Sequence, residues 1–422
     1  MSPSAASNIA PTTSDALPTA SNVVPTAWLR ADACRLDEFI EIVERPTEAT
    51  DFPHAAAVVD RVAVYHSDEL RSAIAAESDR DRDNTPRDGN DTVVDSIRRE
   101  LAEALLNGPG IIVLKGAVSS EAIDRVNDEF YGIIEDEKAS GLASGDHFAK
   151  PGANDRVWNA LEKLALRNPG AFIDYYSNDM IALACEAWLG PDYQVTSQVN
   201  VVNPGGQAQQ PHRDYHLGFM TNEQAERFPS HIHRLSPLLT LQGAVAHCDM
   251  PVETGPTLYL PNSQKYEPGY LAWRLPEFID YFAEHRVQLP LEKGDLVFFN
   301  PALFHAAGTN QTTDIRRIAN LLQISSAMGR AMEKINRRAM STALHPLLLE
   351  RLDAGVPASD LHRAIAAAAE GYPFPASLDV DQPTSGLAPD SQADLARRAL
   401  DERWPVAQLT EALASQARSR AE

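Results

Sequence analysis

The stretch GDLVFFNPALFHAAGTNQTTDIRR, residues 294–317, decides the fold of this chain. Its first part, GDLVFFN, predicts a tight turn followed by a short buried strand, because a glycine precedes an uninterrupted apolar run. His305 follows at the far end of that strand, and a polar turn separates it from Arg316 at the start of the next strand. The stretch therefore predicts a histidine and an arginine on neighbouring strands.

Short apolar runs separated by Gly, Pro and Asn turns continue around this stretch. The predicted strands are residues 56–59, 111–114, 195–202, 239–246, 257–260, 287–289, 296–299 and 318–324. Many short strands with such turns are typical of a sandwich or a barrel. Apolar residues at helical spacing predict helices at 67–76, 92–106, 119–134, 156–166, 171–189, 328–352 and 357–369. The sequence thus predicts the α+β class.

The composition along the chain predicts its domain organisation. Residues 1–27 are rich in Ser, Ala, Thr and Pro, which predicts a disordered segment. Residues 28–91 form an N-terminal extension that ends in a charged linker, and 92–325 hold the strand-rich domain with its flanking helices. Residues 326–422 are predicted to be a helical C-terminal extension, with mixed apolar and basic faces that fit packing against the core, a homodimer surface or a cover over the pocket.

The bulk charge and the cysteines exclude several classes of protein. The 422 residues carry 59 acidic and 37 basic side chains, a formal net charge of -22. Such a surface repels nucleic acid and anionic membranes. The 3 cysteines are scattered without a CxxC pair, which argues against a disulfide framework and fits a reducing compartment. With no basic leader and no long apolar run in view, the expected location is the cytoplasm.

The triplet His212-Arg213-Asp214 is the candidate metal site. Residues two apart on a strand face the same side, so His212 and Asp214 could bind one ion. Two imidazoles and one carboxylate suit iron(II) and leave positions open for a bidentate oxoacid and dioxygen, so His305 is the expected third ligand. A rival triplet, His247-Cys248-Asp249, directly precedes a turn and lies too close to His305 in the sequence for a partner strand pair.

Arginines and amides near the triplet are candidate cosubstrate residues. A guanidinium grips a carboxylate through two parallel hydrogen bonds, so Arg316 is predicted to hold the distal end of 2-oxoglutarate. By strand alternation Arg317 then faces the opposite side, towards substrate or solvent, and Arg213 is expected to form a supporting salt bridge. Gln198 and Asn200 share one strand face and are predicted either to bond 2-oxoglutarate or to form an ordinary buried pair.

At this point the chain resembles the phytanoyl-CoA dioxygenase family. The matching segments, in the family's order, are HRD at 212–214, ETGPTLYLPNS at 253–263 and GDLVFFNPALFHAAGTNQTTDIRR at 294–317. The resemblance implies a double-stranded β-helix (cupin-like, jelly-roll) core that uses iron(II), 2-oxoglutarate and dioxygen. It also implies His212, Asp214 and His305 as metal ligands and Arg316 as the cosubstrate anchor. Asp214 opposes the halogenase branch, in which a small residue replaces this carboxylate.

The function implied by this resemblance is a dioxygenase that hydroxylates a C–H bond of a small-molecule metabolite and releases succinate and carbon dioxide. Desaturation and ring formation use the same chemistry. Two other interpretations share the fold, namely a cupin-type isomerase, which would not need Arg316, and a binding protein without catalytic activity.

Overall fold

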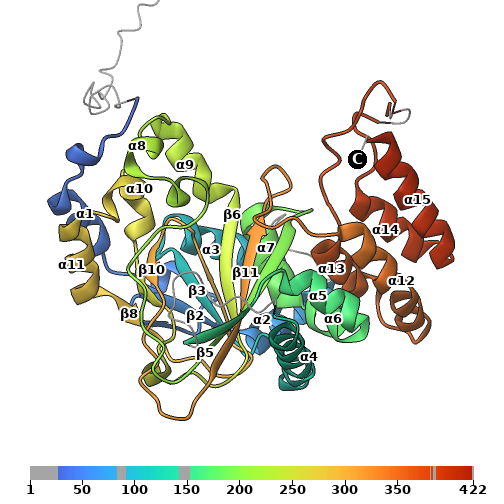
Figure 1. Ribbon diagram of the computed structural model, residues 1–422, viewed down its shortest axis with the longest axis horizontal. Coiled ribbons are helices and arrows are strands. Elements are labelled where there is room, and N and C mark those ends of the chain that lie inside the picture. Colours follow the sequence, from blue (N-terminus) through green and yellow to red (C-terminus); the bar gives the residue numbers. More distant parts are fainter. Residues whose placement is uncertain (1–26, 83–91, 142–152, 381, 384–385, 421–422) are drawn as a thin grey trace, which may run out of the picture.

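The computed structural model describes residues 27–82, 92–141, 153–380, 382–383 and 386–420 (Figure 1). An eight-stranded sheet has the order β1-β2-β3-β9-β6-β11-β5-β4, and a three-stranded sheet has the order β10-β7-β8. The strands are β1 (Ala57–Val59), β2 (Val62–His66), β3 (Ile111–Lys115), β4 (Asn154–Val157), β5 (Gln194–Val202), β6 (Thr240–Ala246), β7 (Leu258–Leu260), β8 (Val287–Gln288), β9 (Leu296–Phe299), β10 (Phe304–Ala306) and β11 (Arg317–Ser325).

Helices lie before, between and after the strands. They are α1 (Leu36–Val43), α2 (Ser67–Arg82), α3 (Val93–Leu106), α4 (Ser120–Ala139), α5 (Ala160–Arg167), α6 (Pro169–Tyr176), α7 (Asp179–Leu189), α8 (Asn222–Ala225), α9 (Ser230–Leu238), α10 (Gly269–Ala272), α11 (Pro276–His285), α12 (Arg337–Asp353), α13 (Ala358–Ala368), α14 (Gln392–Asp401) and α15 (Val406–Ser419). The chain is therefore a mixed α and β protein with one large sheet, in agreement with the predicted class. Within the described residues, no helix is both long and apolar enough to span a membrane.

Most predicted elements are present, and the differences have local causes. The helix predicted over 156–166 is wrong at its start, because residues 154–157 form the edge strand β4 and pair with β5. The helix predicted over 171–189 is divided, since the Asn178 side chain accepts hydrogen bonds from the backbone amides of Met180 and Ile181 and begins α7. The helix predicted from residue 328 begins only at Arg337.

The two faces of the large sheet have different neighbours. On β11, Ile318, Leu322 and Ile324 belong to the main hydrophobic core, together with Phe172 of α6 and Leu344 of α12. Figure 1 shows α5, α6 and α12 on this side of the sheet. The other face looks towards the small sheet. Because successive strand residues alternate between faces, the odd-numbered residues from Arg317 to Gln323 point that way.

The small sheet is held between two apolar layers. On one side, Tyr259 of β7 packs with Val297 and Phe299 of the large sheet. On the other side, Phe304 of β10 packs with Phe39 of α1 at a ring-centroid distance of 5.1 Å. This arrangement fixes β10 opposite the large sheet and leaves space between the sheets.

The segments outside the predicted central domain also pack against it. β1 and β2, within residues 28–91, extend the edge of the large sheet. In the C-terminal extension, the buried Arg337 of α12 donates a hydrogen bond to the Val195 carbonyl of β5 at 2.9 Å, while α14 and α15 form a small apolar cluster of their own. The segment predicted to be disordered lies outside the described residues except for its last residue.

Gly243 of β6 provides a test of this packing. A Cβ at this position would lie 2.5 Å from Cδ1 of Phe298 and 2.7 Å from the Val297 carbonyl. We expect Gly243→Ala to lower the free energy of unfolding by about 1–3 kcal/mol, because the strands must separate to admit the methyl group. Urea denaturation measures this change.

Gly170 of α6 is the matched control, since the atom nearest to a methyl group added there, Asn168 Oδ1, would lie at an ordinary 3.5 Å. We expect Gly170→Ala to change stability by less than about 1 kcal/mol, with alanine favoured in a helix. Equal stability of Gly243→Ala and the wild type would contradict the packing described.

Candidate metal centre

His212 and His305 lie side by side because their backbones are paired. The His212 amide donates to the His305 carbonyl at 2.9 Å, and the His305 amide donates to the His212 carbonyl at 3.2 Å. This isolated antiparallel bridge joins β10 to the segment around His212, which is otherwise not part of a strand. The ring centroids are consequently only 4.4 Å apart.

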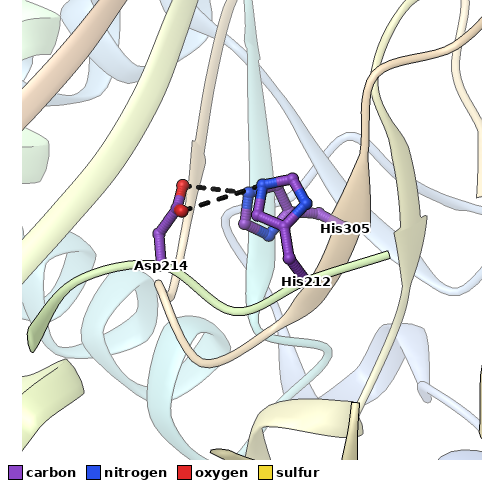
Figure 2. A group of neighbouring side chains, drawn as sticks. All are labelled: His212, Asp214 and His305. Carbon is purple, nitrogen blue, oxygen red and sulfur yellow. Dashed lines mark ion pairs between the residues drawn. The ribbon is translucent and has the colours of Figure 1, made fainter. Parts of the chain in front are cut away.

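Asp214 completes a group of possible metal ligands. Its backbone amide donates to the Pro301 carbonyl at 3.1 Å, which turns the carboxylate towards the two rings (Figure 2). Oδ1 lies 3.7 Å from His212 Nε2, and Oδ2 lies 3.4 Å from His305 Nε2. All the potential ligand atoms lie within 4.8 Å of one another. Among the residues that the structure describes, no other group of His, Cys, Asp and Glu meets this condition.

Backbone carbonyls orient both imidazoles for metal binding. Nδ1 of His212 lies 3.0 Å from the Gln210 carbonyl, and Nδ1 of His305 lies 2.9 Å from the Leu303 carbonyl. A carbonyl only accepts, so each Nδ1 carries a proton, and Nε2 is the nitrogen of each ring that faces Asp214 and the place of a metal ion. Binding of a metal ion at Nε2 requires that this nitrogen be unprotonated.

The charge states also suit a divalent ion. Burial lowers the pKa of His212, which favours its neutral, ligating form. Burial by itself raises the pKa of Asp214, but His212 and then His305 and Gln242 outweigh burial and hold this pKa well below its usual range. Two imidazole nitrogens and an ionised carboxylate are the donor set that non-haem iron(II) prefers, so these residues fit the metal.

The three side chains open into a cavity of about 450 Å³ between the two sheets. One part of its wall is apolar and includes Met250, Leu289 and Leu291. Another part is polar and includes Gln198 of β5 and Gln323 of β11. The cavity is large enough for a small organic acid and a second small molecule beside the candidate metal ligands.

The geometry corrects the prediction for Arg316. Its side chain lies outside the cavity, where it pairs with Asp155 at 3.1 Å and donates to Asn203 at 3.2 Å. Arg317 lines the cavity instead. The predicted alternation was displaced by one residue, because each face of β11 carries both polar and apolar residues, so its sequence does not show which face meets the cavity. Pairing β11 with β5 by register, which aligns Ala319 with Asn200, would have found the correct face.

Arg317 is a buried cation without an acidic partner. Its side chain donates to the Thr254 carbonyl at 3.3 Å, and no carboxylate of the described chain forms an ion pair with it. Burial lowers its pKa to about 10, well within the range in which it stays charged at neutral pH. An uncompensated buried guanidinium is costly, and an anionic ligand would offset that cost.

Other predicted residues are placed as follows. Gln198 and Asn200 both line the cavity. Trp158 also lines it and lies under the Arg156 guanidinium at 4.6 Å. Sequence reasoning missed Gln242, which donates to Asp214 Oδ2. Its signal was a single glutamine in an otherwise apolar strand.

Among the residues that the structure describes, Arg213 has no salt-bridge partner, so the prediction for it is wrong. Its guanidinium is 2% exposed and donates to the carbonyls of Ser263 at 2.6 Å and Tyr266 at 3.0 Å. The rings of Tyr270 and Phe304 lie 5.0 and 5.2 Å from it. The physical reason is its burial on the side away from the cavity, where carbonyls and aromatic faces replace a carboxylate.

The rival triplet has a structural role. His247 is buried behind the large sheet, with Nε2 2.8 Å from the Tyr175 hydroxyl and Nδ1 2.7 Å from Asn127 Oδ1. Both ring nitrogens are therefore occupied by protein partners. Asp249 accepts a hydrogen bond from the Lys293 amide at 2.9 Å, so neither residue faces the cavity.

Comparison with known proteins gives a family and several distant relatives. The model of the family described as Phytanoyl-CoA dioxygenase (PhyH) matches residues 106–318, about half of the chain. Among curated proteins, Dioxygenase trt7 of Aspergillus terreus is 26% identical over 227 residues, which cover 53% of this chain and 72% of that protein. The family match includes the positions of all three candidate ligands.

Solved structures overlap with somewhat more than half of this chain. The non-heme alpha ketoglutarate dependent epimerase SnoN is 20% identical with a TM-score of 0.36, over 55% of this chain and 83% of that one. The carbocyclase SnoK is 20% identical with a TM-score of 0.38, over 57% and 88%. HygX from Streptomyces hygroscopicus, solved with nickel, 2-oxoglutarate and hygromycin B, is 13% identical with a TM-score of 0.37, over 55% and 89%.

Replacing the carboxylates one at a time tests the location of the metal site. We expect Asp214→Ala to weaken iron(II) binding by at least about 100-fold, since it removes a ligand that faces both imidazoles. Asp249→Ala, the matched control from the rival triplet, should bind iron(II) as the wild type does. Anaerobic equilibrium titration measures both affinities. If Asp249→Ala lost iron(II) binding and Asp214→Ala retained it, the metal site would instead lie at the rival triplet.

His247 makes stability depend on pH. Burial lowers its pKa from 6.5 to about 3, so between these values the unfolded chain binds a proton that the folded chain does not. The contribution of His247 to the free energy of unfolding is therefore fully present above about pH 6.5. It decreases by about 1.4 kcal/mol for each pH unit that the solution is made more acidic between the two pKa values.

We expect the wild type to lose about 2 kcal/mol more between pH 7 and pH 5 than His247→Gln, which does not titrate in this range. Urea denaturation at both pH values measures the difference. Parallel losses in the two proteins would mean that His247 is not buried in its neutral form.

Proposed function

The chain belongs to the phytanoyl-CoA dioxygenase family, and on this premise we propose that it hydroxylates a C–H bond of a small-molecule substrate at His212, Asp214 and His305. The protein is a non-haem oxygenase that uses iron(II), 2-oxoglutarate and dioxygen. The family name does not define the substrate, because function depends on the site and not on the fold.

The observation that carries this proposal is a buried, unpaired cation in the same cavity as the candidate metal ligands. A 2-oxoglutarate molecule needs a metal for its keto acid and a cation for its distal carboxylate. Arg317 lines the cavity with the triad and has no acidic partner in the described chain. The hydroxyl groups of Thr257 and Tyr259 line the same region and could donate to a carboxylate.

The arrangement of the sheets supports a finer description of the fold. We take the small sheet and the central strands of the large sheet, from β9 to β5, as the two halves of a double-stranded β-helix. The cavity between them opens beside the β10 histidine. On this description the oxygenase domain extends over residues 92–325, and the N- and C-terminal segments are additions packed against it.

Each group then has a defined task. His212, His305 and Asp214 hold iron(II) and leave coordination positions open, and Arg317 binds the distal carboxylate of 2-oxoglutarate. Asn200, which faces the cavity next to the strand position of Arg317, is a further contact for the cosubstrate. When bound, the metal would activate dioxygen, the oxidant, so that one oxygen atom enters the substrate and the other enters the succinate formed as 2-oxoglutarate loses carbon dioxide. The apolar wall excludes water from the site.

Arginine replacement tests both the function and the corrected anchor. With iron(II), 2-oxoglutarate, ascorbate and dioxygen, we expect the wild type to form succinate, and a mixture of candidate metabolites to yield a product that has gained one oxygen atom. We expect Arg317→Met to raise the Kd for 2-oxoglutarate by at least about 30-fold, since losing one partner of a buried charge pair costs roughly 2 kcal/mol or more. Calorimetric titration of the metal-loaded protein measures this Kd.

Arg316→Met is the matched control, because this side chain is about half exposed and bonded to Asp155 outside the cavity. Its Kd for 2-oxoglutarate should stay within about twofold of the wild type, since exposed ion pairs contribute little. The anchor assignment would be wrong if Arg316→Met lost 2-oxoglutarate binding and Arg317→Met kept it.

A further inference from the structure

A row of hydrogen-bonded side chains crosses the cavity wall from β4 to β6. Arg156 of β4 donates to Gln198 Oε1 of β5. Gln198 Nε2 then donates to Gln323 Oε1 of β11 at 3.3 Å. On the far side, Gln242 of β6 donates through Nε2 to Asp214 Oδ2. All of these side chains line the cavity, so the row leads from its polar wall to a candidate metal ligand.

The row has one gap, between Gln323 and Gln242. These residues are directly opposite each other on β11 and β6, with Cβ atoms expected about 5 Å apart. Nevertheless, Gln242 Oε1 is buried without a hydrogen-bond partner in the described chain, and Gln323 Nε2 has no acceptor among the described residues. A buried oxygen is rarely left in this state, so Gln242 Oε1 points to a missing partner, and the partly buried Gln323 offers its nitrogen to the same space.

The chemistry at the two ends of the row fixes which atoms face the gap. A guanidinium only donates, so Gln198 must present its oxygen to Arg156 and its nitrogen to Gln323. Gln323 therefore presents its oxygen to Gln198 and its nitrogen to the gap. At the other end a carboxylate only accepts, so Gln242 turns its nitrogen to Asp214 and its oxygen to the gap. The orientation of each amide follows from these partners.

The gap thus offers a donor on one side and an acceptor on the other. A hydroxyl group, like water, accepts and donates a hydrogen bond at the same time, whereas a ketone or an ether oxygen only accepts and a hydrocarbon does neither. Nearby, Trp158, Phe219 and Met332 also line the cavity, and these side chains suit an apolar molecular body next to the hydroxyl.

We propose that the gap between Gln242 and Gln323 binds a hydroxyl group of the primary substrate, which is therefore an alcohol with an apolar body. The proposal rests on the proposed function, since it places the substrate beside the triad of an iron(II) oxygenase. Gln242 bonds Asp214 with its nitrogen and the hydroxyl with its oxygen, so the oxidised C–H bond lies close to the carbon that carries the hydroxyl.

A crystal structure tests the gap without any activity. Crystals of the full-length protein are grown with and without glycerol, whose hydroxyl groups serve as the probe. An oxygen atom of water or glycerol is expected within about 3 Å of both Gln242 Oε1 and Gln323 Nε2. A direct hydrogen bond between the two amides, or a protein donor on Gln242 Oε1, would overturn the proposal.

Matched alcohols and ketones test the substrate class. Borneol and cyclohexanol are compared with camphor and cyclohexanone as stimulants of succinate formation, at equal concentrations. In the wild type the alcohols should stimulate at least about tenfold more than their ketones. At saturating iron(II), Gln242→Met should reduce this preference to about twofold or less, because methionine has similar length but lacks the acceptor to which only an alcohol can donate. Gln323→Met removes the donor that alcohols and ketones share, so it should weaken stimulation by both and keep the preference.

The control is Gln408→Met, an exposed glutamine of α15, which should keep the full preference for alcohols. Equal stimulation by alcohols and ketones in the wild type, including no stimulation by either, would overturn the proposal, and so would an intact preference in Gln242→Met. The two proposals fail differently. A wild type that binds iron(II) but never forms succinate contradicts the oxygenase function, whereas succinate formation without preference for alcohols contradicts the hydroxyl site alone.

Discussion

The backbone pairing of His212 with His305 is the interaction on which the candidate centre depends. The two histidines are far apart in the sequence, and only the reciprocal hydrogen bonds of 2.9 and 3.2 Å bring their rings to a centroid distance of 4.4 Å. The same short segment also fixes Asp214 through its amide. Three ligands are thus positioned by main-chain bonds, which do not depend on side-chain rotamers. A site built in this way is preorganised, and the cost of assembling it is met when the chain folds.

Arg213 supports this pairing from behind. It occupies the position between the two ligands of the HxD segment, so its side chain points away from the cavity and into the layer beneath β10. There it binds the carbonyls of Ser263 and Tyr266 and contacts Phe304, the neighbour of His305. Gly269 makes room for it, because a Cβ at that position would lie 2.0 Å from the guanidinium carbon. The arginine therefore links the HxD segment to the strand that carries the second histidine.

The sequence predicted the part of the site that depends on motifs. It failed where the result depends on which face of a strand a residue occupies. His212, Asp214 and His305 were chosen from residue type and order, and the structure brings their side chains together. Arg316 was chosen by spacing, but each face of β11 carries both polar and apolar residues, so nothing local in RIANLLQIS distinguishes the cavity side. Edge strand β4 was mistaken for the start of a helix because its few residues pair with a distant strand. Both errors concern tertiary pairing, which local patterns do not encode.

Strand β11 shows why the face of the sheet on which each residue lies is decisive in this protein. Its cavity face carries Arg317 near one end and Gln323 near the other, a separation of about 20 Å along an extended strand. Its opposite face carries Asn320, which donates to Tyr175 and Tyr176 in the polar cluster that contains His247. A shift of one residue would put that amide in the cavity and both cavity groups in the helical layer. The buried cluster behind the sheet thus stabilises the register on which the charged and amide ends of the cavity depend.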